Sequence, residues 1–169
     1  MKSQNVEPAL PMNKQGELSL SGSAFVTLLR AVLDKGVSFR FRATGFSMSP
    51  FIRNGDVLTV SPLSGGPHLG DVVAFVKRQT GGLVIHRVVR TGAGHCLIRG
   101  DNSSRDDGYV SEADILGRIT KVERSGKKIL LGLGPERYLI SLLARKGLLV
   151  PFFLPVPRRL RTLLRRMQT

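Results

Sequence analysis

Ser47 is the residue whose surroundings point most directly to chemistry. It lies in TGFSMSPFIRNGD, residues 44–56, where glycine, phenylalanine, methionine and proline surround a serine at a predicted bend between a strand end and a turn. A serine hydroxyl is a weak nucleophile at neutral pH, and it needs a general base whose tautomer a third group fixes. The stretch therefore predicts a nucleophile if the rest of the chain supplies a base and a carboxylate.

His86 is the candidate base among the three histidines of the chain. It stands inside LVIHRVVR, where apolar neighbours on both sides fix its position, whereas His68 and His95 adjoin glycine-containing turns. A histidine in such a strand also suits a purely structural role. The three histidines show no spacing typical of metal ligands, so we expect no metal site and no cofactor.

The candidate carboxylates lie in RGDNSSRDDGY, directly after a predicted strand. Asp101, Asp106 and Asp107 fall in this segment, whose composition equally suits turns closed by aspartate and asparagine side chains. The spacing differs from that of a calcium-binding EF-hand loop. A serine, a histidine and an aspartate are the residue types that a nucleophilic triad requires.

The elements that must position these residues follow from hydrophobic periodicity. Between residues 21 and 36, apolar side chains recur at helical spacing, and Gly36 can end the helix. VSFRFRAT then alternates strictly, with Val37, Phe39 and Phe41 on one side. Further strand-like runs are DVLTV, DVVAFVKR, LVIHRVVRT, HCLIRG and ILGRITKVE, separated by turn-forming segments that include DNSSRDDG. We predict a mostly β fold, an antiparallel sheet over about residues 37–124 with a short N-terminal helix.

Three regions are expected along the 169 residues: a mobile arm (1–20), a catalytic domain (21–126) and a basic, apolar, helical tail (127–169). In the tail, Leu160, Leu163, Leu164 and Met167 recur at helical spacing, with arginines on the remaining face. This pattern is typical of an amphipathic helix that lies on an anionic membrane surface. Docking of the same apolar stripe on the domain or on a partner protein is the alternative.

Composition narrows the partners and the location. The net charge of +14 favours an anionic partner, and the tail pairs its arginines with leucines rather than with stacking aromatic residues, which disfavours nucleic acid. The first residues lack the apolar core of a secretory signal, and no uninterrupted apolar run is long enough for a transmembrane helix. Cys96 is the single cysteine, and we expect a buried, inert thiol. A cytoplasmic or peripheral membrane protein is expected.

Several motifs occur in a defined order along the chain: GFSMSPFIRNGDVLTV, GDVVAFV, IHRVVR, IRGDNSSRDDGYV and ILGRI. In this order, over about residues 40–120, they resemble the motifs of type I signal peptidases. The histidine of IHRVVR matches the ER and archaeal branch of that family, where the bacterial branch has a lysine. The resemblance implies a β-rich catalytic domain.

The resemblance also implies roles for particular residues. Ser47 would be the nucleophile, His86 the base and Asp107 the triad acid, with Asp101 a second important carboxylate. In the motif that contains Ser47, here called the serine box, the residues expected to line the substrate groove are Phe46, Met48 and Pro50. Phe46 and Met48 suit core packing equally.

The implied activity is that of a serine endopeptidase that cleaves a signal or leader peptide after small residues. The usual transmembrane anchor before the serine box is not expected, so the enzyme would act on a cytosolic leader or at the membrane face. Two alternatives stay open. One is a self-cleaving repressor-type peptidase that pairs its serine with a lysine, for which Lys77 is the only lysine in the strand region between the motifs. The other is a non-enzymatic basic module that binds an anionic membrane or nucleic acid.

Overall fold

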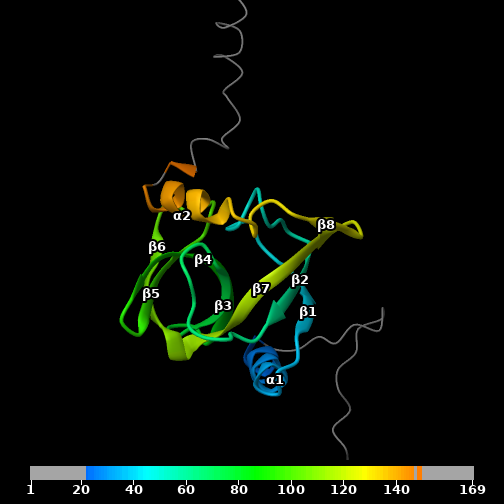
Figure 1. The fold of residues 1–169 in the computed structure, drawn as a ribbon. Helices are drawn as coiled ribbons and strands as arrows, with labels where there is room; N and C mark the ends of the chain where they lie inside the picture. The colour runs from blue at the N-terminus through cyan, green and yellow to red at the C-terminus, as the bar shows by residue number, and fades with distance from the viewer. Residues whose placement is uncertain (1–21, 147, 150–169) are drawn as a thin grey trace, which may run out of the picture.

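A computed structural model describes residues 22–146 and 148–149 of the chain. Figure 1 shows a curled sheet with one helix at each end. The elements follow one another as α1 (Gly22–Asp34), β1 (Phe39–Arg42), β2 (Val57–Ser61), β3 (Val72–Lys77), β4 (Gly82–Gly92), β5 (His95–Arg99), β6 (Asp106–Ser111), the 3-10 turn η1 (Glu112–Asp114), β7 (Ile115–Arg124), β8 (Lys127–Ile129) and α2 (Arg137–Arg145).

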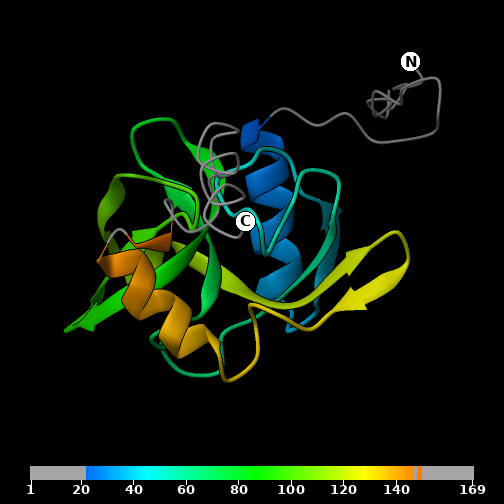
Figure 2. The same cartoon turned by 90° about the horizontal axis from the view of Figure 1, so that it is seen from above.

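All strand pairs of the sheet are antiparallel. The strand order is β1-β2-β7-β3-β4-β5-β6, and β8 pairs with β7 in a hairpin that projects from the side of the molecule in Figure 2. The register shifts within four of the pairings, and such bulges bend and twist the strands, which lets the sheet curl. The predicted mostly β, antiparallel fold with an N-terminal helix is confirmed.

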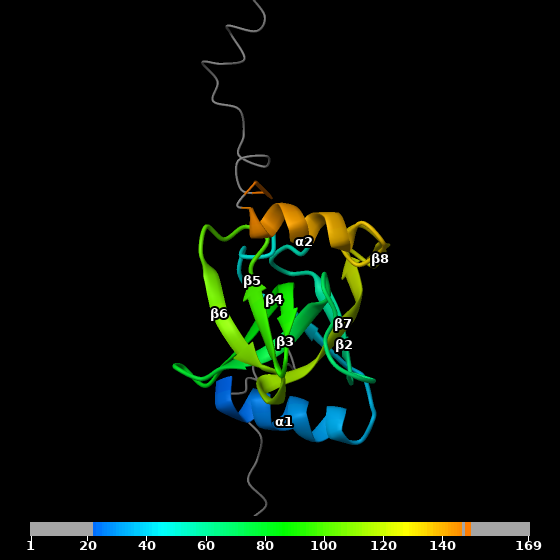
Figure 3. The same ribbon diagram turned by 60° about the vertical axis from the view of Figure 1, so that its left-hand side comes forward.

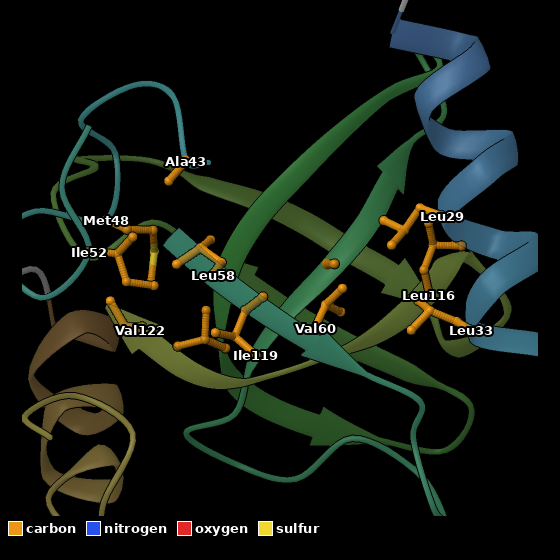
Figure 4. Packing of buried hydrophobic residues seen from close by; sticks show 12 residues of the cluster. Leu29, Leu33, Ala43, Met48, Ile52, Leu58, Val60, Leu116, Ile119 and Val122 are labelled. Atoms are coloured by element: carbon orange, nitrogen blue, oxygen red, sulfur yellow. The ribbon is translucent and has the colours of Figure 1, made fainter. Parts of the chain in front are cut away.

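Helix α1 covers one part of the core with two side chains one turn apart. Leu29 and Leu33 are buried against Leu116 of β7, as Figure 4 shows, in the largest apolar cluster of the described residues. The backbone reverses after the helix at Gly36, whose φ of 76° is readily adopted by glycine. Val37 was predicted to lie on the face of Phe39 and Phe41, but it precedes β1 and is 54% exposed, whereas both phenylalanines pack against the main apolar cluster.

Asp107 lies in a strand, whereas the sequence pattern predicted a loop. Residues 106–111 form β6 because their backbone pairs with β5, with Leu97 opposite Tyr109 and Cys96 opposite Val110. The segment lacks an apolar alternation of its own, so this strand depends on its neighbour. Asp107 lies where the register of this pairing shifts, between Asp106, which is opposite Arg99, and Tyr109.

The part of the predicted tail that the structure describes packs on the sheet. Ile140 and Ala144 of α2 form a cluster with Phe51 and Val89, and α2 sits at the opposite end of the molecule from α1 in Figures 1 and 3. The Glu136 carboxylate precedes α2 and accepts hydrogen bonds from two backbone amides of the connecting loop. The helix predicted around Leu160 to Met167 lies outside the described residues. Among the described residues, no helix is long and apolar enough to cross a bilayer.

Candidate active site

Ser47 sits in a tight turn between β1 and β2. The turn is closed by hydrogen bonds from the Ser49 amide to the Phe46 carbonyl (3.1 Å) and from the Ile52 amide to the Met48 carbonyl (3.0 Å). A third bond anchors the serine itself, because the Asn102 amide donates to the Ser47 carbonyl at 2.7 Å. The bend that the sequence predicted around the serine is therefore held from two sides, by its own turn and by the loop after β5.

His86 bridges Ser47 and Asp107. Its Nε2 lies 2.8 Å from Ser47 Oγ, and its Nδ1 is hydrogen-bonded to Asp107 Oδ2. Because an ionised carboxylate only accepts, Nδ1 donates to Asp107, which leaves Nε2 as the acceptor for the serine hydroxyl. His86 is 9% exposed, so its ring is held by the protein while one edge stays open to a groove. The three residues predicted to act together are thus brought together.

Asp107 is held in its ionised form. Burial raises its pKa, but hydrogen bonds and charge interactions with His86 and then Lys77 outweigh that effect and bring the pKa below its ordinary value. Lys77 Nζ lies 3.3 Å from Asp107 Oδ1, the oxygen that does not contact His86. The neighbouring Asp106 is exposed and closes a turn with the Gly108 amide. The carboxylate beside the histidine is therefore Asp107, as the motif spacing predicted.

Asp101 contacts Arg87 rather than the Ser47–His86 pair. Arg87 donates from Nε and Nη2 to the two carboxylate oxygens at 2.8 and 2.7 Å, and both side chains are buried. Arg87 Nη1 also donates to the carbonyls of Gly70 and Gly132, each at 2.9 Å. This pair ties the loop after β5 to the strand that carries His86, so its geometry suits positioning rather than contact with a substrate.

Gly100 and Asn102 are site residues to which sequence reasoning gave no role of their own. A Cβ at Gly100 would lie 2.8 Å from the Ser47 carbonyl oxygen and 2.9 Å from His86 Nε2. Only glycine lets the loop after β5 approach the serine and histidine this closely. Asn102 also donates from Nδ2 to the Phe46 carbonyl at 3.3 Å. The signal was present in the quoted motif IRGDN, which contains both residues.

A groove of about 850 Å³ runs past Ser47, His86 and Asp107. Its lining is mostly apolar and includes Phe25, Phe41, Ala43, Ile52 and Leu58.

The three residues expected to line the groove lie in different surroundings. Met48 lines it and is also a core residue, 4% exposed. Phe46 is 68% exposed and Pro50 is partly buried, and neither belongs to the described lining.

One edge of β4 faces this groove. Residues 82–87 pair with β3, whereas pairing with β5 begins only at Arg87. Residues 82–86 line the groove with the backbone edge that no described strand covers. Such an edge can accept an extended polypeptide as an additional strand.

Cys96 takes no part in this arrangement. Its side chain is fully buried in the cluster around Val73 and Phe75. Burial, followed by the nearby carboxylates of Glu112 and Asp71, raises the pKa of the thiol to about 11. Among the described residues, no group of histidine, cysteine and carboxylate side chains could hold a metal ion.

A family model described as Peptidase S24-like matches residues 11–120, and the chain belongs to this family. The match covers β1 to β6 and most of β7, and it includes Ser47, His86 and Asp107. The family supports a serine-type peptidase or a repressor-type fold, within a superfamily that also includes signal peptidases. A comparison with curated proteins gave no match.

Proposed function

We propose that this protein is a serine endopeptidase that cleaves a leader or signal segment of another polypeptide, with Ser47, His86 and Asp107 as its catalytic residues. The observation that carries the proposal is the continuous hydrogen-bonded chain from Ser47 Oγ through both nitrogens of His86 to Asp107. A hydroxyl in such a chain can lose its proton as it attacks a carbonyl. The specific signal-peptidase activity is the finer part of this proposal.

The steps follow from the positions of the three side chains. Ser47 Oγ attacks the scissile carbonyl while His86 Nε2 takes the hydroxyl proton, and Asp107 stabilises the imidazolium that results. The tetrahedral intermediate expels the amine, which receives the proton from His86. A water molecule then enters, gives a proton to His86 and hydrolyses the acyl-enzyme ester, which restores Ser47.

The developing oxyanion needs a preorganised donor. The backbone N–H of Ser47 is the donor we assign, since hydrogen bonds on either side of the residue hold its turn in place. One such donor lowers the barrier by roughly 3 kcal/mol. The position two residues before the nucleophile is Gly45, which offers no side-chain hydroxyl.

The groove supports an extended polypeptide substrate. The open edge of β4 at residues 82–86 ends at the candidate base, so a segment paired along that edge would run toward Ser47. The mostly apolar lining suits a leader segment with small and apolar side chains near the cut. We therefore expect cleavage in trans of a flexible segment rather than of a folded domain.

The contact of Lys77 favours histidine as the base over the repressor-type alternative. The hydrogen bond described for Lys77 goes to Asp107, on the side away from His86. His86, and not Lys77, is within hydrogen-bond distance of Ser47 in the described contacts. The non-enzymatic alternative gives no reason for the close approach of Gly100 to the serine and histidine.

The test is acylation by a serine-reactive phosphonate, measured by intact mass on the full chain. Wild type should gain one adduct, Ser47→Ala none, and the matched control Ser49→Ala, in the same turn, should label like wild type. His86→Ala should label at least a hundredfold more slowly. An unlabelled but folded wild type would count against the peptidase, and label lost in Lys77→Ala but kept in His86→Ala would support the repressor-type alternative.

A further inference from the structure

Helix α2 has apolar side chains on both of its faces. Ile140 and Ala144 are buried against the sheet, whereas Leu139 and Leu142 on the outward side are 60% and 48% exposed. Tyr138, also outward, is 49% exposed. Arg145 is exposed as well, so the outward side of α2 combines apolar and basic side chains. Only the inner face of α2 is covered by the described residues.

The exposed apolar surface extends beyond the helix. Of the eleven exposed large apolar residues in the described chain, six fall between positions 130 and 148. We call these six the α2 surface: Leu130, Leu131, Tyr138, Leu139, Leu142 and Leu148. Isolated exposed apolar residues are ordinary, but a gathering of this kind marks an interaction site.

Positive charge surrounds the α2 surface. Arg145 and Lys146 are exposed in the last turn of α2 and directly after it, and Lys127 and Lys128 are exposed on β8. Glu136 is the only acidic residue among the described residues after 123, and its carboxylate is turned toward the backbone amides of the loop before α2. The charge therefore complements an anionic partner, and the leucines require that partner to be apolar as well.

The position of these elements suits a flat partner. In Figures 1 and 3, β8, the connecting loop and α2 all lie at the same end of the molecule, opposite α1. One plane at this end can contact the helix and the loop together. The same end is tied to the candidate active site, because the carbonyl of Gly132 in this loop accepts a hydrogen bond from Arg87, the residue after His86.

We propose that the α2 surface docks on a membrane that contains anionic phospholipids. Leu139 and Leu142 enter the boundary between headgroups and acyl chains, and Arg145 and Lys146 remain at the level of the phosphates. Phe51, in the turn that carries Ser47, shares an apolar cluster with Ile140 and Ala144 of α2, so docking there would hold the serine turn close to the membrane. The proposal does not depend on peptidase activity, since it concerns a different surface and is measured without a substrate.

The absence of tryptophan from the chain allows a local test. The full chain with Leu139→Trp is mixed with vesicles of phosphatidylcholine and phosphatidylglycerol, and its emission is compared with that of Val37→Trp. Val37 is 54% exposed and lies three residues after the last residue of α1, the helix at the other end of the molecule. The expected result is a blue shift, and quenching by lipids brominated in their acyl chains, for Leu139→Trp alone. Vesicles of phosphatidylcholine alone should give a much smaller effect.

A second pair of variants tests the charge. Neutralising Arg145 and Lys146 to glutamine should weaken vesicle binding roughly thirtyfold. The matched control neutralises Arg30 and Lys35, which are exposed on α1 and just after it, and should change binding little. Circular dichroism of each variant checks that it is folded.

Three outcomes would overturn the proposal. The first is that the chain sediments with anionic vesicles while the emission of Leu139→Trp stays unshifted, which would assign binding to other residues. The second is a blue emission without vesicles that depends on protein concentration, which would indicate a second copy on this surface. The third is a blue emission without vesicles at every concentration, which would indicate that the chain itself covers α2.

Discussion

Two neighbouring residues of β4 each pair with an aspartate, and the two pairs do different work. His86 contacts Asp107 beside the groove, whereas Arg87 contacts Asp101 in the interior. Successive side chains of a strand point to opposite faces of the sheet, so a single step along β4 separates the two environments. His86 is 9% exposed with one edge on the groove, and Arg87 is fully buried.

The difference teaches that a base and an acid do not by themselves make a reactive site. A guanidinium offers donors but no acceptor, and the described hydrogen bonds of Arg87 reach Asp101 and two backbone carbonyls, so this side chain can hold its partners but cannot act as a base. His86 keeps one nitrogen for Asp107 and the other for Ser47. Reactivity depends on a titratable partner with one free lone pair at an open surface.

The largest expected effect is a loss of acylation rate when the His86–Asp107 pair is broken. Asp107→Asn should lower the acylation rate of Ser47 roughly 10⁴-fold, because the amide favours the wrong imidazole tautomer. The free energy of unfolding should change far less, since the side chain borders the groove. Acylation kinetics and urea denaturation of the same preparation provide the measurement, and a near-normal rate would remove Asp107 from the triad.

The reverse result is expected for the buried pair. Asp101→Ala should lower the free energy of unfolding by about 3–5 kcal/mol, because it leaves the Arg87 guanidinium buried without a counter-charge. Any protein that still folds should keep the pKa values of its acylation profile, since Asp101 does not contact His86 in the described contacts. An unchanged stability would mean that water reaches Arg87.

Gly100 lies between the His86–Asp107 and Arg87–Asp101 pairs. Its substitution should lower both the acylation rate and the free energy of unfolding, each by a moderate amount. The added methyl of Gly100→Ala would meet the Ser47 carbonyl and His86 Nε2 at under 3 Å. We expect the overpacking to cost about 1–3 kcal/mol of stability and to impair acylation by displacing the histidine. Gly92→Ala in the same strand as His86 is the matched control, because its methyl would lie 3.6 Å from its nearest neighbour.

Substitution of Lys77, which contacts Asp107 of the His86–Asp107 pair, should lower the catalytic rate less than the changes above. Its side chain is 39% exposed, and an exposed ion pair contributes about 0.2–1 kcal/mol, so Lys77→Met should reduce kcat by less than about fivefold. If the effect of Lys77→Met comes from losing the positive charge beside Asp107, Lys77→Arg should keep the wild-type rate. Arg78→Met provides the control, because Arg78 pairs with Asp114 instead. A rate lost completely in Lys77→Met would contradict this positioning role.

The smallest expected effect is a change in the free energy of unfolding at low pH. Because the folded pKa of Asp107 lies below the ordinary 3.8, the unfolded chain binds this proton first as the pH falls. The stabilisation from ionised Asp107 is complete above that ordinary value and is lost as the pH falls through the folded pKa. The stability difference between wild type and Asp107→Asn should therefore narrow below pH 3.8. The stability difference between wild type and Asp56→Asn should narrow over the same pH range. Burial raises the pKa of Asp56, but interactions with Arg124 and Arg53 outweigh that effect and lower it.

Sequence patterns predicted the central strands and the three residues of the candidate triad. Apolar runs between turn-forming segments located most of the strands: β2 alternates between buried and partly buried positions, whereas β3 and β4 each have four consecutive buried positions. This signal failed for β6, whose DDGYVS is a strand through pairing with β5. The choice of Asp107 over Asp106 came from motif spacing, and Asp107 is the carboxylate that is hydrogen-bonded to His86 in the structure.

The partner of Asp101 could not be predicted in the same way. Arg87 and Asp101 are fourteen positions apart, on β4 and after β5, and nothing local indicates that both would be buried. The packing of α2 could not be predicted either, because Ile140 and Ala144 form a cluster with Phe51 and Val89, which are distant in the sequence. Long-range contacts of this kind depend on the finished topology rather than on periodicity.

The topology also decides when the candidate site exists during folding. Ser47, His86 and Asp107 come from three separated segments, and β2 beside the serine turn pairs with β7, more than fifty residues later. Pairings between distant segments form slowly because a long loop must close first. A nascent or partly refolded copy would therefore lack the assembled candidate site. Recovery of Ser47 acylation after dilution from denaturant would accordingly report closure of the whole sheet.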